Sequence, residues 1–191
     1  MSLNILPFLL EKATNGGKPE KKSMFNPSLF YQLLNDPFWV WCKYHAPKDE
    51  AVDETSAYDK LTQQAGRDFE EEWVRKHHPN AIKVEPEWGF AALRRTLELM
   101  ASGVKAIYQP SLCLLEEKIY GRGDLLIRNN SHGSSLGPFH YRIKEIKQSK
   151  ELKDYHAYQA AAYNLMLGAI QGYCPNKIEI VLAESAQSIK H

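Results

Sequence analysis

The fold is decided by residues 139–147, Phe-His-Tyr-Arg-Ile-Lys-Glu-Ile-Lys, in which apolar and polar side chains roughly alternate. Alternation of this kind is typical of a half-buried β-strand, because successive side chains of a strand point to opposite faces. Glu145 and Lys147 therefore share one face, while Ile146 packs on the other. The strand is predicted to carry an acid and an amine side by side near its end.

A second acid lies in the predicted strand that precedes this one. Residues 119–128 read as extended and contain Gly-Arg-Gly-Asp-Leu-Leu at 121–126. Pairing of the two strands would bring Asp124 close to Glu145. Two carboxylates can hold a hard cation such as Mg²⁺ together with waters and phosphate oxygens, and Lys147 could orient or help deprotonate an attacking water. These residue types predict metal-assisted hydrolysis of a phosphodiester.

Glu-x-Lys alone is a weak signal, because the chain contains it four times, starting at Glu20, Glu116, Glu145 and Glu151. Most such pairs are solvated surface charges. A plain hairpin with surface charges is therefore the alternative reading of the third copy, which its position at the end of an alternating strand argues against.

A helix is expected after this strand, over residues 151–167, with Gly168 as its stop. Gln159 and Tyr163 are one helical turn apart and share a face. An amide and a phenol beside a metal site suit contacts with phosphates or bases. The alternative is that both only form hydrogen bonds within a helix–sheet interface.

Six short motifs occur in one order along the chain: Gly-Arg-x-x-Glu at 66–70, Ile-Tyr-Gln at 107–109, Gly-Arg-Gly-Asp-Leu-Leu at 121–126, Glu-Ile-Lys at 145–147, Gln-x-x-x-Tyr at 159–163 and Gln-Gly-x-x-Pro at 171–175. This order resembles the RecB-like branch of the PD-(D/E)xK nuclease superfamily, over roughly residues 55–184. The resemblance implies a restriction-endonuclease-like α/β core, an αβββαβ mixed sheet flanked by helices, that cuts DNA with Mg²⁺ or Mn²⁺.

The same resemblance assigns roles to individual residues. Asp124, Glu145 and Lys147 would form the catalytic centre, and Glu70 would be an accessory carboxylate from the first core helix. The metal ligands would be Asp124, Glu145 and Glu70. Contacts with nucleic acid would come from Gln159, Tyr163 and Arg122. From the residues alone, Glu70 reads equally well as part of a solvated acidic run that continues into 71–72.

Two departures from the family pattern limit what is carried over. Phe69 precedes Glu70 where relatives often have a metal-binding His, so the metal preference of this chain can differ. Some relatives also hold an iron–sulfur cluster with four Cys, whereas this chain has only Cys42, Cys113 and Cys174. No iron–sulfur cluster is expected.

Length and composition favour one main core. A chain of 191 residues with 43% apolar content can bury one sizeable core. We expect residues 1–54 to form an N-terminal arm and helical cap, and residues 55–191 to form the nuclease core. The predicted core elements are helices over 57–77 and 90–102, and strands over 82–84, 104–109 and 178–182, with residues 183–191 trailing off.

The N-terminal region is expected to begin with a loose arm over residues 4–23. Asn26-Pro27 predicts a helix start, running to about residue 34, and Asp36-Pro37 restarts the chain. The aromatic stretch 38–44 is interpreted mainly as the core of the cap, with base stacking as the alternative. Residues 48–56 are expected to form a linker or loop.

Charge and cysteine usage bear on partners and location. The net charge is only +1, but basic residues cluster in sequence around the predicted site and favour a local phosphate track, at Arg122, Arg128, Arg142, Lys144, Lys147, Lys150 and Lys153. Scattered Cys residues favour a reducing, cytoplasmic setting. The apolar run 5–10 is too short for a membrane span.

The expected partner is DNA, single-stranded or at duplex ends. Because relatives are frequently longer, the chain is also expected to be part of a larger protein or complex.

Two other functions remain open on the sequence. The first is a nucleic-acid-binding module that keeps the fold but is catalytically degenerate, which the missing His at position 69 favours and intact residues 124, 145 and 147 oppose. The second is a metal-dependent hydrolase of another phosphate ester. DNA cleavage with Mg²⁺ or Mn²⁺ separates these from a nuclease.

Overall fold

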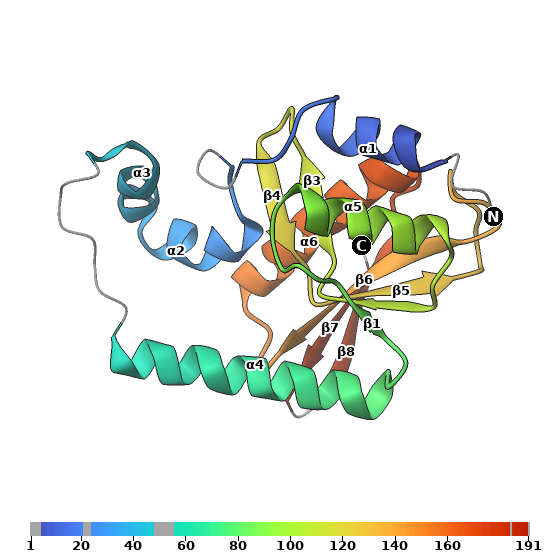
Figure 1. Cartoon of the computed structure of the whole chain (residues 1–191). Helices are drawn as coiled ribbons and strands as arrows, with labels where there is room; N and C mark the ends of the chain where they lie inside the picture. Colours follow the sequence, from blue (N-terminus) through green and yellow to red (C-terminus); the bar gives the residue numbers. More distant parts are fainter. Residues whose placement is uncertain (1–4, 21–23, 48–55, 184, 191) are drawn as a thin grey trace.

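The chain is a mixed α/β protein, in which helices cover both faces of a mixed sheet (Figure 1). The computed structural model describes residues 5–20, 24–47, 56–183 and 185–190. Helices α1, α5 and α6 lie on one face of the sheet, and α4 lies on the other (Figure 1). The α/β class expected from the sequence is confirmed.

The main sheet has six strands in the order β1-β2-β5-β6-β7-β8. Their bounds are Ile82–Lys83, Ala106–Tyr108, Leu125–Asn129, His140–Lys147, Lys177–Leu182 and Ser185–Lys190. Strands β2, β5 and β6 form an antiparallel meander, β7 runs parallel to β6, and β8 is antiparallel to β7. A parallel neighbour requires a crossover, which α6 provides. A separate hairpin pairs β3, Ser111–Leu114, with β4, Ile119–Arg122.

The helices begin at polar caps where the sequence offers them. Asn26 accepts a hydrogen bond from the backbone N–H of Ser28, and Asp36 caps α3 in the same way. The helical elements are η3 Pro27–Leu29, α1 Leu6–Thr14, α2 Phe30–Asn35, α3 Pro37–His45, α4 Ala57–His77, α5 Phe90–Ala101 and α6 Asp154–Gln171. The helices expected over 57–77 and 90–102 are confirmed to within one residue.

Strand β6 separates two hydrophobic clusters, as its alternation predicts. Ile143 belongs to the larger cluster, between the sheet and helices α1, α5 and α6. Ile146 belongs to the smaller one, where Phe69 and Trp73 of α4 pack. Glu145 and Lys147 consequently lie on the same side as the larger cluster, at the end of the strand. None of the helices within the described part of the chain is long and apolar enough to cross a membrane.

The stretch 119–128 is two strands, not the single strand predicted. β4 pairs with β3, whereas β5 belongs to the main sheet, so the chain leaves one sheet and enters the other at Gly123-Asp124. A Cβ atom on Gly123 would lie 2.8 Å from Ile143 Cδ1 and 3.4 Å from Glu145 Oε1. The glycine therefore permits the close approach that places Asp124 against β6.

Helix α6 does not stop at Gly168, which corrects a second prediction. It ends at Gln171 and is capped by Gly172, whose φ of 69° is the left-handed conformation of a helix cap. Gly168 is a packing contact, since a Cβ there would lie 2.9 Å from Cys174 Cβ. The glycine lets the turn after the helix fold back on it.

Both ends of the chain are more ordered than predicted. Residues 6–14 of the expected loose arm form α1, which buries Leu6, Leu9 and Ala13 in the main cluster. Beyond the predicted last strand, β8 adds a sixth strand where the chain was expected to trail off. The linker expected at 48–56 lies outside the described residues except for Ser56, which caps α4.

The aromatic stretch on α3 is only partly buried, so its interpretation as a cap core is wrong for Phe38 and Trp41. Only Val40 is buried on this helix. Phe38 is 70% exposed and Trp41 is 55% exposed. Their rings stack on one another at a centroid distance of 6.0 Å. Phe38 and Trp41 thus face solvent, whereas Trp39 on the same helix is half-buried.

Candidate functional site

Asp124, Glu145 and Lys147 converge where β5 begins and β6 ends. Strand pairing sets Leu125 opposite Lys144, which brings the preceding Asp124 beside Glu145. Lys147 Nζ lies 2.8 Å from Glu145 Oε2 and 3.2 Å from Asp124 Oδ2. The spatial grouping expected from strand spacing is therefore present.

Backbone hydrogen bonds fix the two acids relative to each other. The N–H of Asp124 donates to Glu145 Oε1 at 3.2 Å, and the N–H of Ile146 donates to Asp124 Oδ2 at 2.7 Å. Each carboxylate thus accepts a bond from the backbone of the opposite strand. This exchange continues the pairing of β5 and β6 beyond the last regular pair.

Opposing effects act on the pKa of Glu145. It has no solvent exposure, and burial raises the pKa of its carboxyl to about 7, with the neighbouring Asp124 charge acting in the same direction. Lys147 opposes the shift through its charge and its hydrogen bond. Burial therefore favours the neutral form of Glu145, and Lys147 favours its charged form.

Lys147 remains a cation despite its burial. Burial by itself lowers the pKa of the amine, but the charges of Asp124 and Glu145 outweigh it and hold the pKa above its ordinary value. A protonated amine cannot accept a proton from water. Lys147 was predicted either to orient the attacking water or to help deprotonate it, and its positive charge favours the first role.

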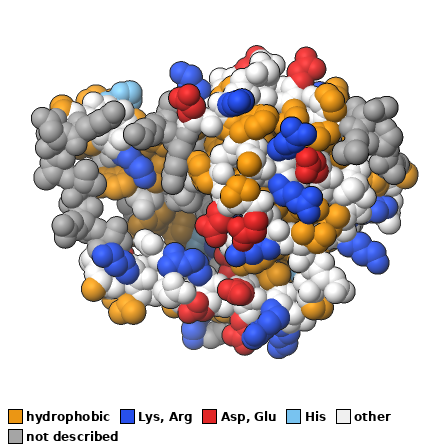
Figure 2. All heavy atoms as spheres, viewed as in Figure 1, with side chains coloured by type: hydrophobic (Ala, Val, Ile, Leu, Met, Phe, Trp, Pro, Cys, Tyr) orange, Lys and Arg blue, Asp and Glu red, His pale blue; other side chains and the backbone are white. Residues whose placement is uncertain are grey.

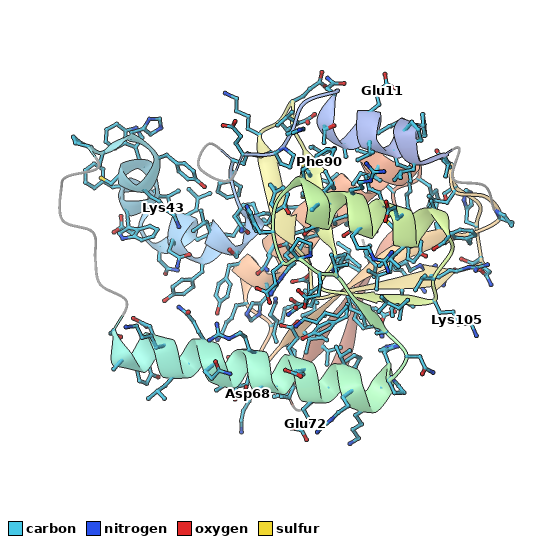
Figure 3. All side chains as sticks on the ribbon, in the orientation of Figure 1. Glu11, Lys43, Asp68, Glu72, Phe90 and Lys105 are labelled. Carbon is cyan, nitrogen blue, oxygen red and sulfur yellow. The ribbon has the colours of Figure 1, made fainter. Side chains whose placement is uncertain are left out.

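Glu70 approaches the same place from α4. Its carboxylate accepts a hydrogen bond from Gln109 Nε2 at 3.1 Å. Burial, followed by repulsion from Asp124, raises the pKa of Glu70 to about 7, while hydrogen bonds from Gln109 and Tyr108 oppose the shift. The acids that follow it, Glu71 and Glu72, are exposed. Figure 3 shows Glu72 on the side of α4 that faces away from the sheet. Glu70 is thus separated from the solvated acidic run.

A pocket of about 400 Å³ opens in front of these residues. It is lined by Asn26, Ser28, Glu70, Glu87, Trp88, Gln109, Arg122, Gly123, Asp124, Gln159 and Tyr163. Glu145 is not among the lining residues, because it lies behind Asp124 and Gly123 with both carboxylate oxygens hydrogen-bonded. The acids predicted as metal ligands therefore form two layers, with Glu70 and Asp124 at the pocket and Glu145 behind.

Gln109 is a site residue to which the sequence alone gave no definite role. It follows β2 with a φ of 53°, an unfavourable conformation for a residue other than glycine. Its Oε1 atom is buried in the pocket wall without a hydrogen-bond partner. Strained backbone and an unsatisfied buried oxygen are both typical of functional sites. Its place directly after a short buried strand was the available signal.

The three residues predicted to contact nucleic acid differ in availability. Tyr163 is only 1% exposed, and its hydroxyl donates to the backbone carbonyl of Arg122 at 2.9 Å. It packs on Gly121, where a Cβ would lie 2.7 Å from the ring. Gln159 lines the pocket, as does Arg122, which is ion-paired with Glu87 at 3.1 Å. Tyr163 therefore positions the β4–β5 junction, and since it also lines the pocket, its contact with nucleic acid stays a prediction.

Other lining residues come from segments that the sequence did not connect with the site. Asn26 and Ser28 belong to the N-terminal region, and Glu87 and Trp88 to the segment between β1 and α5. The N-cap signal at Asn26 was visible, but its proximity to Asp124 depends on packing between distant segments. The pocket is completed by the N-terminal region.

The predicted phosphate track is divided between different surfaces. Arg142 and Lys144 are on the face of β6 opposite to Glu145. Lys144 pairs with Glu179 at 2.8 Å and lies over the Trp73 ring. Arg128 stacks on Phe139 at the other end of β5. The basic residues that cluster in the sequence therefore do not form a single basic surface.

The oxygen atoms at the pocket suit a hard divalent cation. Within the described residues, no group of three His, Cys, Asp or Glu side chains forms a ready-made metal site. Mg²⁺ does not require one, because it commonly uses one or two carboxylates plus water and substrate phosphate. Asp124, Glu70 and the unpartnered Gln109 Oε1 provide oxygen donors at one pocket. The donor chemistry fits Mg²⁺ or Mn²⁺.

The fold and site together define a mixed α/β protein with a carboxylate-rich pocket backed by a buried lysine. No family model matches the sequence, and no curated protein matches it either.

Proposed function

We propose that this chain is a divalent-metal-dependent nuclease that hydrolyses phosphodiester bonds of DNA, of the RecB-like, restriction-endonuclease-like kind. The observation that carries the proposal is the contact of Lys147 Nζ with both Asp124 and Glu145 at the base of a carboxylate-rich pocket. The elements α4, β2, β5, β6, α6 and β7 follow in the order of an αβββαβ core, with β1, α5 and the β3–β4 hairpin inserted between them, and this order supports the proposal.

In this proposal Asp124 and Glu145 hold Mg²⁺ or Mn²⁺, with Glu70 as an accessory ligand. Although both oxygens of Glu145 accept hydrogen bonds, each retains a further lone pair. A divalent ion at this position would stabilise negative charge on the phosphate. The Gln109 amide, hydrogen-bonded to Glu70, keeps that carboxylate directed at the pocket.

The chain's own residues would then align the attack. Lys147 is a fixed cation at 16% side-chain exposure, so it can orient a water and neutralise charge that develops during the reaction. Gln159 lines the pocket and can bind a flanking phosphate, and Arg122, although paired with Glu87, keeps further N–H donors for one. Tyr163 holds the backbone that carries Arg122 and Asp124.

The test is cleavage of labelled single-stranded and duplex DNA with Mg²⁺ or Mn²⁺, with and without chelator. Lys147→Ala should abolish metal-dependent cutting. Lys144→Ala is the matched control, since Lys144 is on the opposite face of the same strand and pairs with Glu179. Equal cutting by wild type and Lys147→Ala would contradict the proposed mechanism.

Two other functions give different results in the same assay. A degenerate nucleic-acid-binding module would bind DNA but not cut it under any metal condition. A hydrolase of another phosphate ester would act on nucleotides and leave polynucleotides intact. The buried charge balance among Asp124, Glu145 and Lys147 favours the nuclease, because a binding module needs no such arrangement.

A further inference from the structure

Beside the pocket lie four aromatic side chains that we call the aromatic patch: Phe30 and Tyr31 on α2, and Tyr155 and Tyr158 on α6. The ring centroids of Phe30 and Tyr158 are 5.9 Å apart, and those of Tyr31 and Tyr155 are 5.1 Å apart. Neither pair is stacked face to face. Tyr31 and Tyr158 are each 51% exposed. The patch thus joins α2 to α6 and still presents ring surface to solvent.

The aromatic patch and the pocket share two segments of the chain. Tyr158 directly precedes the pocket residue Gln159, and Phe30 follows closely after the pocket residue Ser28. Helix α2 lies against α6 (Figure 1). Between this region and α4 the surface is hollowed, with hydrophobic side chains inside the hollow (Figure 2). The patch and part of the pocket wall are therefore carried by α6 and by the segment from η3 to α2.

Cations at the pocket are already paired with acids. Arg122 binds Glu87, and Lys147 binds Asp124 and Glu145. Duplex DNA is bound mainly through phosphate contacts with available Lys and Arg side chains. Next to these paired cations, the aromatic patch offers half-exposed ring surface. Rings of this kind stack on base faces, which a duplex hides within its own stack and a single strand exposes.

We infer that the aromatic patch binds unstacked bases of a single-stranded polynucleotide, and that the adjoining phosphates enter the carboxylate pocket. This inference rests on the proposed nuclease function and narrows its substrate to single strands or single-stranded ends. Stacking requires no particular base, so recognition by the patch is tolerant of sequence.

The test measures binding apart from cutting. A single-stranded DNA oligonucleotide carrying 2-aminopurine is titrated with the Glu145→Gln protein in Mg²⁺, and a blunt hairpin duplex of equal length is titrated in parallel. Fluorescence anisotropy gives the affinity, and the 2-aminopurine intensity reports stacking on a ring. We expect tighter binding of the single strand, accompanied by quenching.

Three variants in the same background locate the contact. Tyr158→Leu should weaken single-strand binding by about tenfold and remove part of the quenching, because it keeps an apolar side chain but loses the ring. Tyr158→Phe should bind nearly as the parent does. Phe8→Ala is the control, since Phe8 is a 40% exposed aromatic residue on α1.

The outcomes separate this inference from the proposed function. Equal or tighter binding of the duplex, or unchanged binding by Tyr158→Leu, overturns the inference, and the wild type can still be a metal-dependent nuclease. Stacking and single-strand preference without cutting by the wild type remove the nuclease proposal and support the patch. Loss of binding in Tyr158→Phe as well as Tyr158→Leu would assign the contact to the hydroxyl and overturn stacking.

Discussion

The pocket and the aromatic patch beside it are built on different principles. On the sheet side, Asp124, Glu145 and Lys147 are largely buried and bonded to each other and to the backbone. On the helical side, Tyr31 and Tyr158 contact neighbouring rings but remain half exposed. Bond cleavage requires groups held within a fraction of an ångström, whereas recognition of variable bases requires open apolar surface. In the proposed function, the sheet side carries out the chemistry and the helical side selects the substrate.

Glu145→Gln should have the largest effect on the sheet side. The amide keeps the shape of the side chain but removes a charge, so we expect the cleavage rate to fall by about 10²–10³-fold. Thermal stability should be retained or raised, because burial and Asp124 both disfavour the charged form of Glu145. Glu179→Gln, which removes a partly exposed carboxylate on β7, is the control and should leave cleavage unchanged. Full activity of Glu145→Gln would contradict the assigned role.

Two glycine substitutions test how tightly the sheet side is packed. Gly121→Ala places a Cβ 2.7 Å from the Tyr163 ring and 2.9 Å from Pro27, so it should destabilise the protein by about 1–3 kcal/mol. Gly66→Ala on α4 meets nothing within 4 Å and should stabilise the helix by up to about 1 kcal/mol. Urea denaturation gives both values. Equal stability of the two variants would show that the junction at Gly121 can relax.

Metal binding should stabilise the protein more as the pH rises. Glu70 and Glu145 have pKa values raised from 4.5 to about 7, so folding retains their protons and the metal-free protein loses stability as the pH rises through this window. A divalent cation stabilises the deprotonated forms. The gain in Tm from saturating Mg²⁺ should therefore be small near pH 5 and larger near pH 8. A gain that does not depend on pH would place the ion elsewhere.

The smallest effects on stability are expected on the exposed helical side. Trp41→Ala should change the free energy of unfolding by no more than about 0.5 kcal/mol, because the ring is 55% exposed. Val40→Ala on the same helix should cost about 0.5–3 kcal/mol, since Val40 is 6% exposed. Thermal denaturation compares them directly. A large loss for Trp41→Ala would mean that α3 contributes its rings to a core after all.

Elements and neighbouring site residues were predicted best where the periodicity of the sequence is strong and local. The alternation of residues 139–147 correctly predicted β6 and the shared face of Glu145 and Lys147. Pairing with the preceding strand correctly predicted that Asp124 would join them. The long helix over 57–77 was predicted to the residue. Each of these follows from interactions between residues close in sequence or on adjacent strands.

The remaining features depend on contacts between distant segments. The division of 119–128 into β4 and β5 depends on Gly123 packing against Ile143, which no local pattern contains. Gly168 resembles a helix stop, but its role becomes visible only when Cys174 folds back on it. The burial of Tyr163 and the exposure of Trp41 likewise depend on which neighbour covers each ring. The pocket residues from the N-terminal region were missed for the same reason.

The hydrogen bond from the Ile146 N–H to Asp124 Oδ2 has a consequence for evolution. The carboxylate replaces a main-chain carbonyl at the point where two strands separate, so an aspartate here would be retained for folding even in a descendant with no enzymatic activity. A survey of homologous sequences should therefore give little weight to an invariant Asp124. Under the proposed function, covariation between Glu145 and Lys147 is the more informative record, because a buried acid and its cation would be lost together once catalysis no longer required them.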